Sequence, residues 1–290
     1  MKIEFYGVRG SMPTPGENTV VYGGNTSCVY LELSNGNNVI LDSGTGIAKL
    51  NGKFKSYKRP IHLLVTHNHW DHIQGFPYFA PIYSENTTIE IITGITDSND
   101  TDMILKQMSG SNHPIKYDQL PSKITLNTEL AHQKEFSLNT FKVTTQALNH
   151  PDGGTAYCLQ GDGQKVAYVT DNELKPPYTE SSTWDEWVAF IKDADVLIHD
   201  AQYTNKDLPL KHGWGHSTYE QVAELALQAN VKKLFIISHD PSATDTELED
   251  HEKELQHKLK NTLSITWAKE GSSYLVDTQV LGTVTSKRAQ

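Results

Sequence analysis

Four side chains that bind metal ions well stand within six residues of one another, directly after an apolar run that is typical of a β-strand. They are His67, His69, Asp71 and His72. Side chains two positions apart on an extended chain face the same way, so His67 and His69 can reach one ion. A turn after the intervening tryptophan would direct Asp71 and His72 towards a second ion. Because imidazole and carboxylate groups are common zinc ligands, the cluster predicts a metal centre rather than a histidine-rich surface loop.

Three further candidate ligands stand at the ends of other apolar runs. His150 follows the run at 141–147, Asp171 ends the run at 166–169, and His239 follows the run at 234–237. In α/β sheets, loops at strand ends aim side chains while the strands stay rigid, so ligands gather there. Each residue alone is a weak signal. Together with the cluster, they predict one site assembled from several strand ends.

The motifs, in this order, resemble those of the metallo-β-lactamase fold hydrolases, and the resemblance covers nearly the whole chain. The family signature His-x-His-x-Asp-His is matched by residues 67–72, and later motifs by 149–151, 168–171 and 238–240. The resemblance implies two metal ions. Zinc suits these donors, while manganese and iron remain open. The implied ligands are His67, His69, His150 and Asp171 for one ion, and Asp71, His72, His239 and the shared Asp171 for the other.

The same resemblance implies an α/β (α+β) fold, the four-layer αβ/βα sandwich, in which helices cover the outer faces of two facing sheets. We expect a single domain over residues 1–290, because no Pro-, Gly- or Ser-rich linker divides the chain. The segment at about 85–140 has a polar middle, and we expect an insertion or lid there. The best helix is expected over 217–229, with Ser217 and Glu220 as its capping box.

Two aspartates are expected behind the ligands. Asp42 ends the strand before the metal-binding strand, and the family implies that it holds a ligand histidine through a hydrogen bond. The alternative is an ordinary turn aspartate. Asp200, which ends the run Val196 to His199, is expected to act in a similar way.

The motif Gly-Trp-Gly-His-Ser-Thr at 213–218 narrows the reaction. It resembles a motif of the phosphodiesterase branch, which includes transfer-RNA 3′-processing endonucleases and cyclic-phosphate hydrolases. There the histidine faces the leaving group, so His216 is the expected general acid. The alternatives are a residue that merely precedes the helix cap, or His212 in the same role. Asp71 is the second expected catalytic residue, because it holds an ion that would carry the attacking hydroxide.

The expected substrate is a cyclic nucleotide monophosphate, opened to a linear nucleotide. The His216 motif, the Arg9 loop and residues 22–26 look most like bacterial and phage cyclic-nucleotide phosphodiesterases, some of which are anti-Pycsar proteins that act in host–virus conflict. The alternative is an RNA 3′-endonuclease or another cyclic-phosphate hydrolase. A di-iron redox protein and a metal-bound binding module without turnover are the non-hydrolase alternatives. The intact His-x-His argues against the redox family.

The amino-acid composition limits the kinds of binding partner that we expect for this chain. A net charge of −10 and a pI near 5.7 argue against a dedicated nucleic-acid surface, so we expect a small anionic nucleotide and no stable nucleic-acid complex. Cys28 and Cys158 stand in apolar runs as reduced thiols, which suits the cytoplasm. No signal peptide or membrane-spanning stretch is visible, so no membrane partner is expected. The resemblance also implies a homodimer.

Overall fold

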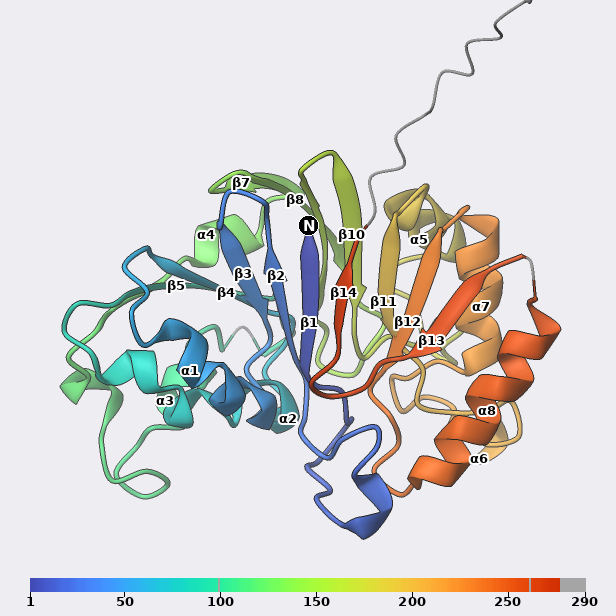
Figure 1. Cartoon of the computed structure of the whole chain (residues 1–290), viewed down its shortest axis with the longest axis horizontal. Coiled ribbons are helices and arrows are strands. Elements are labelled where there is room, and N and C mark those ends of the chain that lie inside the picture. The colour runs from blue at the N-terminus through green and yellow to red at the C-terminus, as the bar shows by residue number, and fades with distance from the viewer. Residues whose placement is uncertain (99, 261, 277–290) are drawn as a thin grey trace, which may run out of the picture.

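The strands form two seven-stranded mixed sheets in the computed structural model, which describes residues 1–276 apart from 99 and 261 (Figure 1). The first sheet has the order β14-β1-β2-β3-β4-β5-β6 and the second the order β13-β12-β11-β10-β9-β8-β7. The first sheet contains β1 (Lys2–Gly7), β2 (Cys28–Glu32), β3 (Asn38–Leu41), β4 (Ile61–Val65), β5 (Thr88–Thr93), β6 (Lys123–Leu126) and β14 (Ser273–Leu275). The second contains β7 (Glu135–Leu138), β8 (Phe141–Ala147), β9 (Thr155–Gly161), β10 (Gln164–Val169), β11 (Val196–Asp200), β12 (Lys233–Ile237) and β13 (Ser264–Trp267).

Helices cover the outer face of each sheet. Those beside the first sheet are short, whereas α5, α7 and α8 cover the second sheet in Figure 1. The helices are α1 (Asn51–Phe54), α2 (Trp70–Ile73), α3 (Met103–Lys106), α4 (Thr128–Ala131), α5 (Trp184–Ile191), α6 (Leu208–Lys211), α7 (Tyr219–Gln228) and α8 (Asp245–Lys258).

Three apolar layers hold these elements together. One lies between the sheets and joins residues such as Leu41 of β3 and Tyr168 of β10. A second lies between the second sheet and its helices, where Trp187 and Leu225 are fully buried. The third packs the short helices on the first sheet. Strands that are apolar on both faces, such as β4 and β11, follow from this layering, since both of their faces are covered. The predicted four-layer α/β sandwich is confirmed.

The carboxyl ends of the parallel strands position the candidate ligands. β3, β4, β5 and β6 are mutually parallel in the first sheet, as are β10, β11, β12 and β13 in the second. Residues that follow β4 and β10 therefore meet at one edge of the sandwich. A parallel edge of this kind is where α/β proteins place their ligands.

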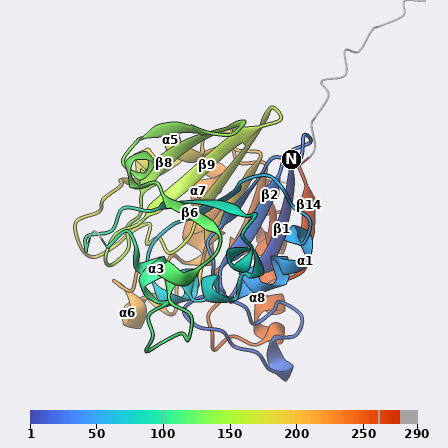
Figure 2. The same ribbon diagram turned by 90° about the vertical axis from the view of Figure 1, so that its left-hand side faces the viewer.

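The segment at 85–140, expected to be an insertion or lid, is largely part of the sandwich. β5 and β6 complete one edge of the first sheet, and β7 forms an edge of the second. The described residues of 94–122, with α3 among them, connect β5 to β6 on the side that faces the viewer in Figure 2, and 127–134 connect β6 to β7. β6 and β7 have four residues each, and only Phe136 and Leu138 of β7 are buried, so their hydrophobic pattern is too short to be recognised in the sequence.

The predicted helix at 217–229 is α7, but its cap differs from the prediction. Thr218, rather than Ser217, is the N-cap, and Gln221 completes the capping box. The Ser217 hydroxyl instead donates to the backbone oxygen of Asn172, at 2.5 Å. The helix start is thereby joined to the loop after β10. Among the described residues, no helix is long and apolar enough to cross a membrane.

Candidate metal centre

Three histidines and an aspartate converge where β4, β8 and β10 end. Potential ligand atoms of His67, His69, His150 and Asp171 all lie within 4.8 Å of one another. The Nε2 atoms of His67 and His150 are 3.7 and 3.8 Å from Oδ2 of Asp171. Imidazole nitrogens and a carboxylate oxygen are zinc donors, so these four residues would hold one ion.

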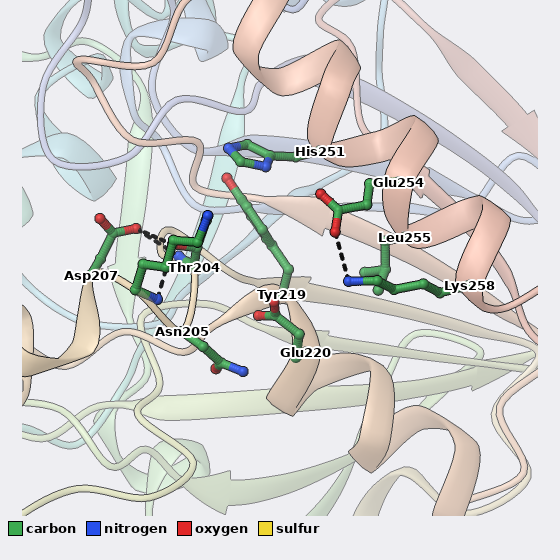
Figure 3. A pocket seen from close by; sticks show the side chains of 10 residues that line it. Thr204, Asn205, Asp207, Tyr219, Glu220, His251, Glu254, Leu255 and Lys258 are labelled. Atoms are coloured by element: carbon green, nitrogen blue, oxygen red, sulfur yellow. Dashed lines mark hydrogen bonds and ion pairs between the residues drawn. The ribbon is translucent and has the colours of Figure 1, made fainter.

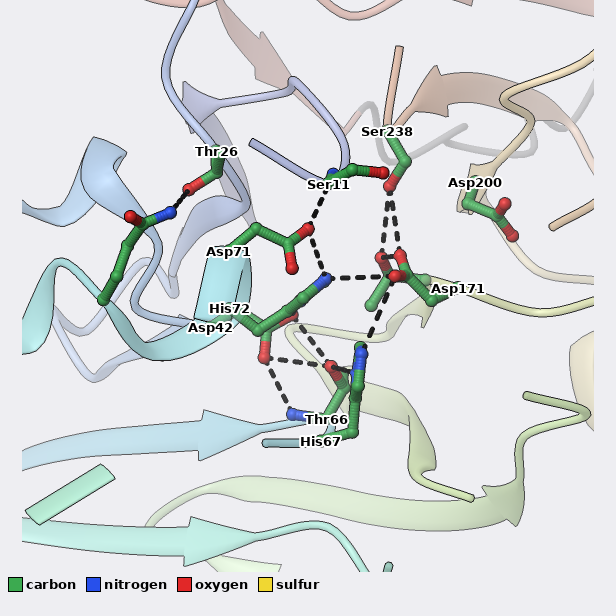
Figure 4. A network of polar contacts seen from close by, with 12 residues as sticks. Ser11, Thr26, Asp42, Thr66, His67, Asp71, His72, Asp171, Asp200 and Ser238 are labelled. Atoms are coloured by element: carbon green, nitrogen blue, oxygen red, sulfur yellow. Dashed lines mark hydrogen bonds and ion pairs between the residues drawn. The ribbon is translucent and has the colours of Figure 1, made fainter. Parts of the chain in front are cut away.

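A second group shares Asp171 with the first. Oδ2 of Asp171 is 3.3 Å from Nε2 of His72, and Oδ2 of Asp71 is also 3.3 Å from that nitrogen. Asp171 therefore belongs to both groups and would be the ligand that two ions share (Figure 4). The structure brings six of the seven candidate ligands together, in the two groups expected for them.

The chemistry of these donors fits metal ions. Nε2 of His67 and Nε2 of His72 are buried and have no hydrogen-bond partner, which is costly unless a ligand satisfies them. Burial and neighbouring histidines hold the pKa of His67 well below its usual value, and burial lowers that of His150 to about 4. Both rings are therefore neutral at physiological pH, as a ligand imidazole must be.

His72 stands among carboxylates. Burial acts to lower its pKa, but the carboxylates of Asp71, Asp171 and Asp42 together raise it well above the usual value. The surroundings thus stabilise a positive charge at this ring. A metal ion bound at Nε2 would supply this positive charge, which a proton supplies when no metal is bound.

Asp42 lies directly behind His72. Its Oδ2 is 2.9 Å from Nδ1 of His72 and accepts a hydrogen bond from the Tyr168 hydroxyl, while Oδ1 accepts from the Thr66 backbone N–H. Both side chains are fully buried. The hydrogen bond to Nδ1 directs Nε2 towards Asp71 and Asp171, the arrangement that orients ligand histidines in metal sites.

The backbone bends sharply at three of the strand ends. Asp42, Asp171 and Ser238, which follow β3, β10 and β12, have φ values of +58°, +51° and +57°. This left-handed region is costly for residues with a side chain and tends to occur at functional sites. At each bend, the side chain no longer follows the alternating directions of side chains along the strand, so Asp171 and Ser238 both face the site (Figure 4).

The structure does not bring His239 to the cluster. After the bend at Ser238, the Ser238 hydroxyl lies 3.4 Å from Asp171 Oδ1, and the next side chain points elsewhere. His239 is fully buried, its Nε2 lies 2.8 Å from the Ala268 backbone oxygen, and its ring packs edge-on against Tyr22. The motif therefore marks the correct strand end, but Ser238 occupies the place expected for His239.

The loop after β1 also contributes to the site. The backbone N–H of Ser11 donates to Asp71 Oδ2 at 2.8 Å. Arg9 is fully buried and donates to the backbone oxygens of Gly23, Asp240 and Ala243. It thereby ties the loop after β1 to the loop after β12. The family resemblance pointed to this loop, but it did not show that Arg9 holds two loops together.

His216 faces the same cavity without joining either ligand group. Its Nδ1 is 3.1 Å from Asp200 Oδ2, and its ring centroid is 5.9 Å from that of His150. Burial acts to lower the pKa of His216, but Asp171, Asp200 and Asp71 raise it above the usual value. Asp200 was expected to hold a ligand histidine; it holds His216 instead. His212 is directed away, with Nε2 2.9 Å from the Lys175 backbone oxygen.

Glu173 holds the loop that carries His216, a role that was not predicted from the sequence. Its buried carboxylate accepts hydrogen bonds from the backbone N–H groups of Gly213 and Gly215, at 2.9 and 3.0 Å. Both glycines have positive φ, +90° and +86°. A Cβ on Gly215 would lie 2.3 Å from Cδ2 of His150, so only glycine lets the loop approach this ligand so closely.

A cavity of about 570 Å³ opens over these residues. Its walls come from both halves of the molecule, and Lys211, whose Nζ is 2.7 Å from Asp240 Oδ2, is the one lysine or arginine among the described lining residues. The lining residues are Ser11, His69, Trp70, Asp71, His150, Asp171, Gln202, Tyr203, Lys211, Trp214, His216, Asp240 and Pro241.

A different cavity, of about 380 Å³, lies between α7 and α8 and shares none of these residues (Figure 3). One ion pair joins two of its lining residues, Glu254 and Lys258, at 2.7 Å. Neither group of potential metal ligands among the described residues lies in this cavity. The metal cluster remains the candidate site.

Comparison with known proteins agrees with this geometry. The chain is 25% identical to a ribonuclease Z of Picrophilus torridus, over 85% of this chain and 88% of the relative. The short form of human tRNase Z superposes with a TM-score of 0.63 at 21% identity, covering 96% of this chain and all of the other. The metallo-β-lactamase fold protein YhfI of Bacillus subtilis superposes with a TM-score of 0.67 at 17% identity, covering 94% and 98%. Residues 37–239 match the β-lactamase superfamily domain, so the chain belongs to that family, with the metallo-β-lactamase fold.

Proposed function

We propose that this chain is a metal-dependent hydrolase of phosphodiester bonds, and that an RNA 3′ end is its best-supported substrate. The observation that carries the proposal is the position of His216. It is a buried proton donor held by Asp200 beside two ligand groups that do not need it. A phosphodiester leaves as an alkoxide, so a proton at the leaving oxygen lowers the barrier.

Two zinc ions in the two groups would activate a water and stabilise the charge on the phosphoryl oxygens. The protein supplies the rest. Asp42 keeps Nε2 of His72 directed at the site, and the Ser11 N–H keeps Asp71 in place. Asp200 keeps His216 in the orientation from which its ring can give a proton to the departing oxygen. Manganese or iron would bind to the same donors, but more weakly than zinc.

The relatives favour RNA over a cyclic nucleotide. Ribonuclease Z of Picrophilus torridus aligns over most of both chains, which supports an RNA substrate here as well. One observation supports the cyclic nucleotide as a second candidate: residues 95–122, beside the first sheet, contain four aspartates and two lysines, and the cavity's single lysine is already paired. An RNA-binding arm would be basic, whereas a small nucleotide needs none.

A panel of substrates tests the proposal. Zinc-loaded protein would be offered an RNA with a 3′ extension, a linear dinucleotide, and 2′,3′- and 3′,5′-cyclic nucleotides. We expect cleavage of the RNA with a higher kcat/KM than for either cyclic compound. A higher kcat/KM for a cyclic nucleotide would instead identify the second candidate, including an anti-Pycsar activity. Failure to cleave any phosphodiester would disprove the function.

We also propose that the protein is a homodimer. Met12, Val20 and Val21 are 55%, 74% and 51% exposed in the segment between β1 and β2, and exposed apolar side chains of this kind suit a subunit contact. Light scattering at micromolar concentration should give the mass of two chains, and Val20→Asp should shift it towards one. A monomer mass for the unchanged protein would contradict the prediction.

A further inference from the structure

The five tryptophans of the chain divide sharply by exposure. Trp187 and Trp267 are fully buried in the core, and Trp184 is partly buried. Trp70 and Trp214 are 67% and 61% exposed, and both line the cavity over the metal cluster. Large indole rings left in water beside a site point to a contact with something that is not part of this chain.

The two exposed rings come from opposite halves of the molecule. Trp70 begins α2, between His69 and Asp71, one ligand from each group, on the side of the first sheet. Trp214 belongs to the loop before α7, on the side of the second sheet, two residues before His216. Both indoles therefore border the cavity in which a phosphate would lie near the ligand groups and His216.

Both positions are rigid enough to act as platforms. Trp70 is the first residue of a helical turn that is closed by a hydrogen bond from the Gln74 N–H to its backbone oxygen, at 2.8 Å. The N–H groups of Gly213 and Gly215, on both sides of Trp214, donate to the buried Glu173 carboxylate. A ring on a fixed backbone loses little freedom when it stacks on a flat partner.

We propose that Trp70 and Trp214 each stack on one nucleobase, one on either side of the scissile phosphodiester. The inference rests on the proposed function, and it names the substrate class of the same site as a linear diester with two bases. Of the described residues that line the walls, Lys211 is the one lysine or arginine, and it is paired with Asp240. Apart from His216 and the metal centre, the cavity therefore offers stacking surfaces rather than free cations. Base–aromatic stacking tolerates every base, because each has a π-face.

The kinetic test compares two substrates with the same leaving group: the p-nitrophenyl ester of thymidine 5′-phosphate and methyl p-nitrophenyl phosphate. Alongside them, the dinucleotide UpA supplies a base on both sides. For UpA we expect Trp70→Ala and Trp214→Ala each to lower kcat/KM by about 5- to 150-fold, chiefly through KM. Replacement by phenylalanine should restore most of the loss. For methyl p-nitrophenyl phosphate, the loss should be much smaller.

Tyr78→Ala is the matched control, because Tyr78 is 66% exposed on the same side as Trp70 but does not line the cavity. It should leave all three rates unchanged. Metal content of each variant is measured, since Trp70 neighbours two candidate ligands. If Trp70→Ala loses metal, it is replaced in the test by Trp70→Phe and Trp70→Leu, provided that both retain metal. Trp70→Phe, which keeps an aromatic ring, should then bind UpA more tightly than Trp70→Leu.

Two results would overturn the inference while the proposed function stands. One is cleavage of methyl p-nitrophenyl phosphate with no difference between the tryptophan variants and Tyr78→Ala on UpA. The other is a loss confined to a single tryptophan, because one base, as in a cyclic mononucleotide, then suffices. Absence of any cleavage would contradict the function itself. A separate measurement uses metal-free protein. UpA should quench its tryptophan fluorescence, and this quenching should be weaker in each single variant.

Discussion

Replacing His69 with alanine should remove metal from the first ligand group and reduce phosphodiester hydrolysis to background. The group has four donors within 4.8 Å, and His69 is the one exposed member, so its loss opens the site to water without leaving a large buried hole. The measurement is metal content of zinc-supplemented, dialysed protein, with two ions per chain expected before the substitution and one or none after it. Metal and activity should fall together, because the same ligands hold the ion and the reaction depends on it.

A graded series makes this result specific. Asp42→Asn weakens the support of His72 without removing a ligand, and should cost about 10–100-fold in metal affinity or activity, less than His69→Ala. His257→Ala, on the exposed surface of α8, is the matched control and should keep both ions. His239→Ala should also keep both, because its Nε2 is engaged with Ala268. A single ion, or none, in the unchanged protein would contradict the two-metal centre.

Much of this site could be predicted from the sequence, because its chemistry is local. The ligands after β4 stand within six residues, and the two-residue period of an extended chain already directs His67 and His69 together. Asp171 follows a short apolar run, which is interpreted as a buried strand. The layered α/β fold was implied by the family resemblance, and strands that are apolar on both faces fit it, since such strands need cover on each side.

What the sequence missed depends on backbone bends and contacts between distant segments. The left-handed residue after β12 decides that Ser238, not His239, faces Asp171, and no periodicity reveals a single bend. The hydrogen bonds from the loop at 213–215 to Glu173 span 40 residues of sequence. Glycines on both sides of Trp214 were a signal of a tight loop, but not of the carboxylate that holds it.

Replacing His216 with alanine should keep both metal ions and slow an unactivated diester such as UpA by roughly 10²–10⁴-fold, the usual contribution of a general acid. His216 belongs to neither ligand group, so the metal content should not change. The loss should be much smaller for a p-nitrophenyl diester, whose leaving group needs little protonation. Steady-state rates on the two substrates, with metal analysis of the same samples, measure the difference.

Asp200→Asn separates the acid role from a purely structural one. Asp200 holds His216 through a single contact at 3.1 Å and touches neither ligand group through its carboxylate, so it acts by orienting the ring. The variant should reproduce part of the His216→Ala loss, again larger for the alkyl diester than for the nitrophenyl one. Equal slowing of both substrates, with metals retained, would mean that His216 positions the phosphate or shapes the loop. The leaving oxygen would then take its proton from water, and the acid role would be wrong.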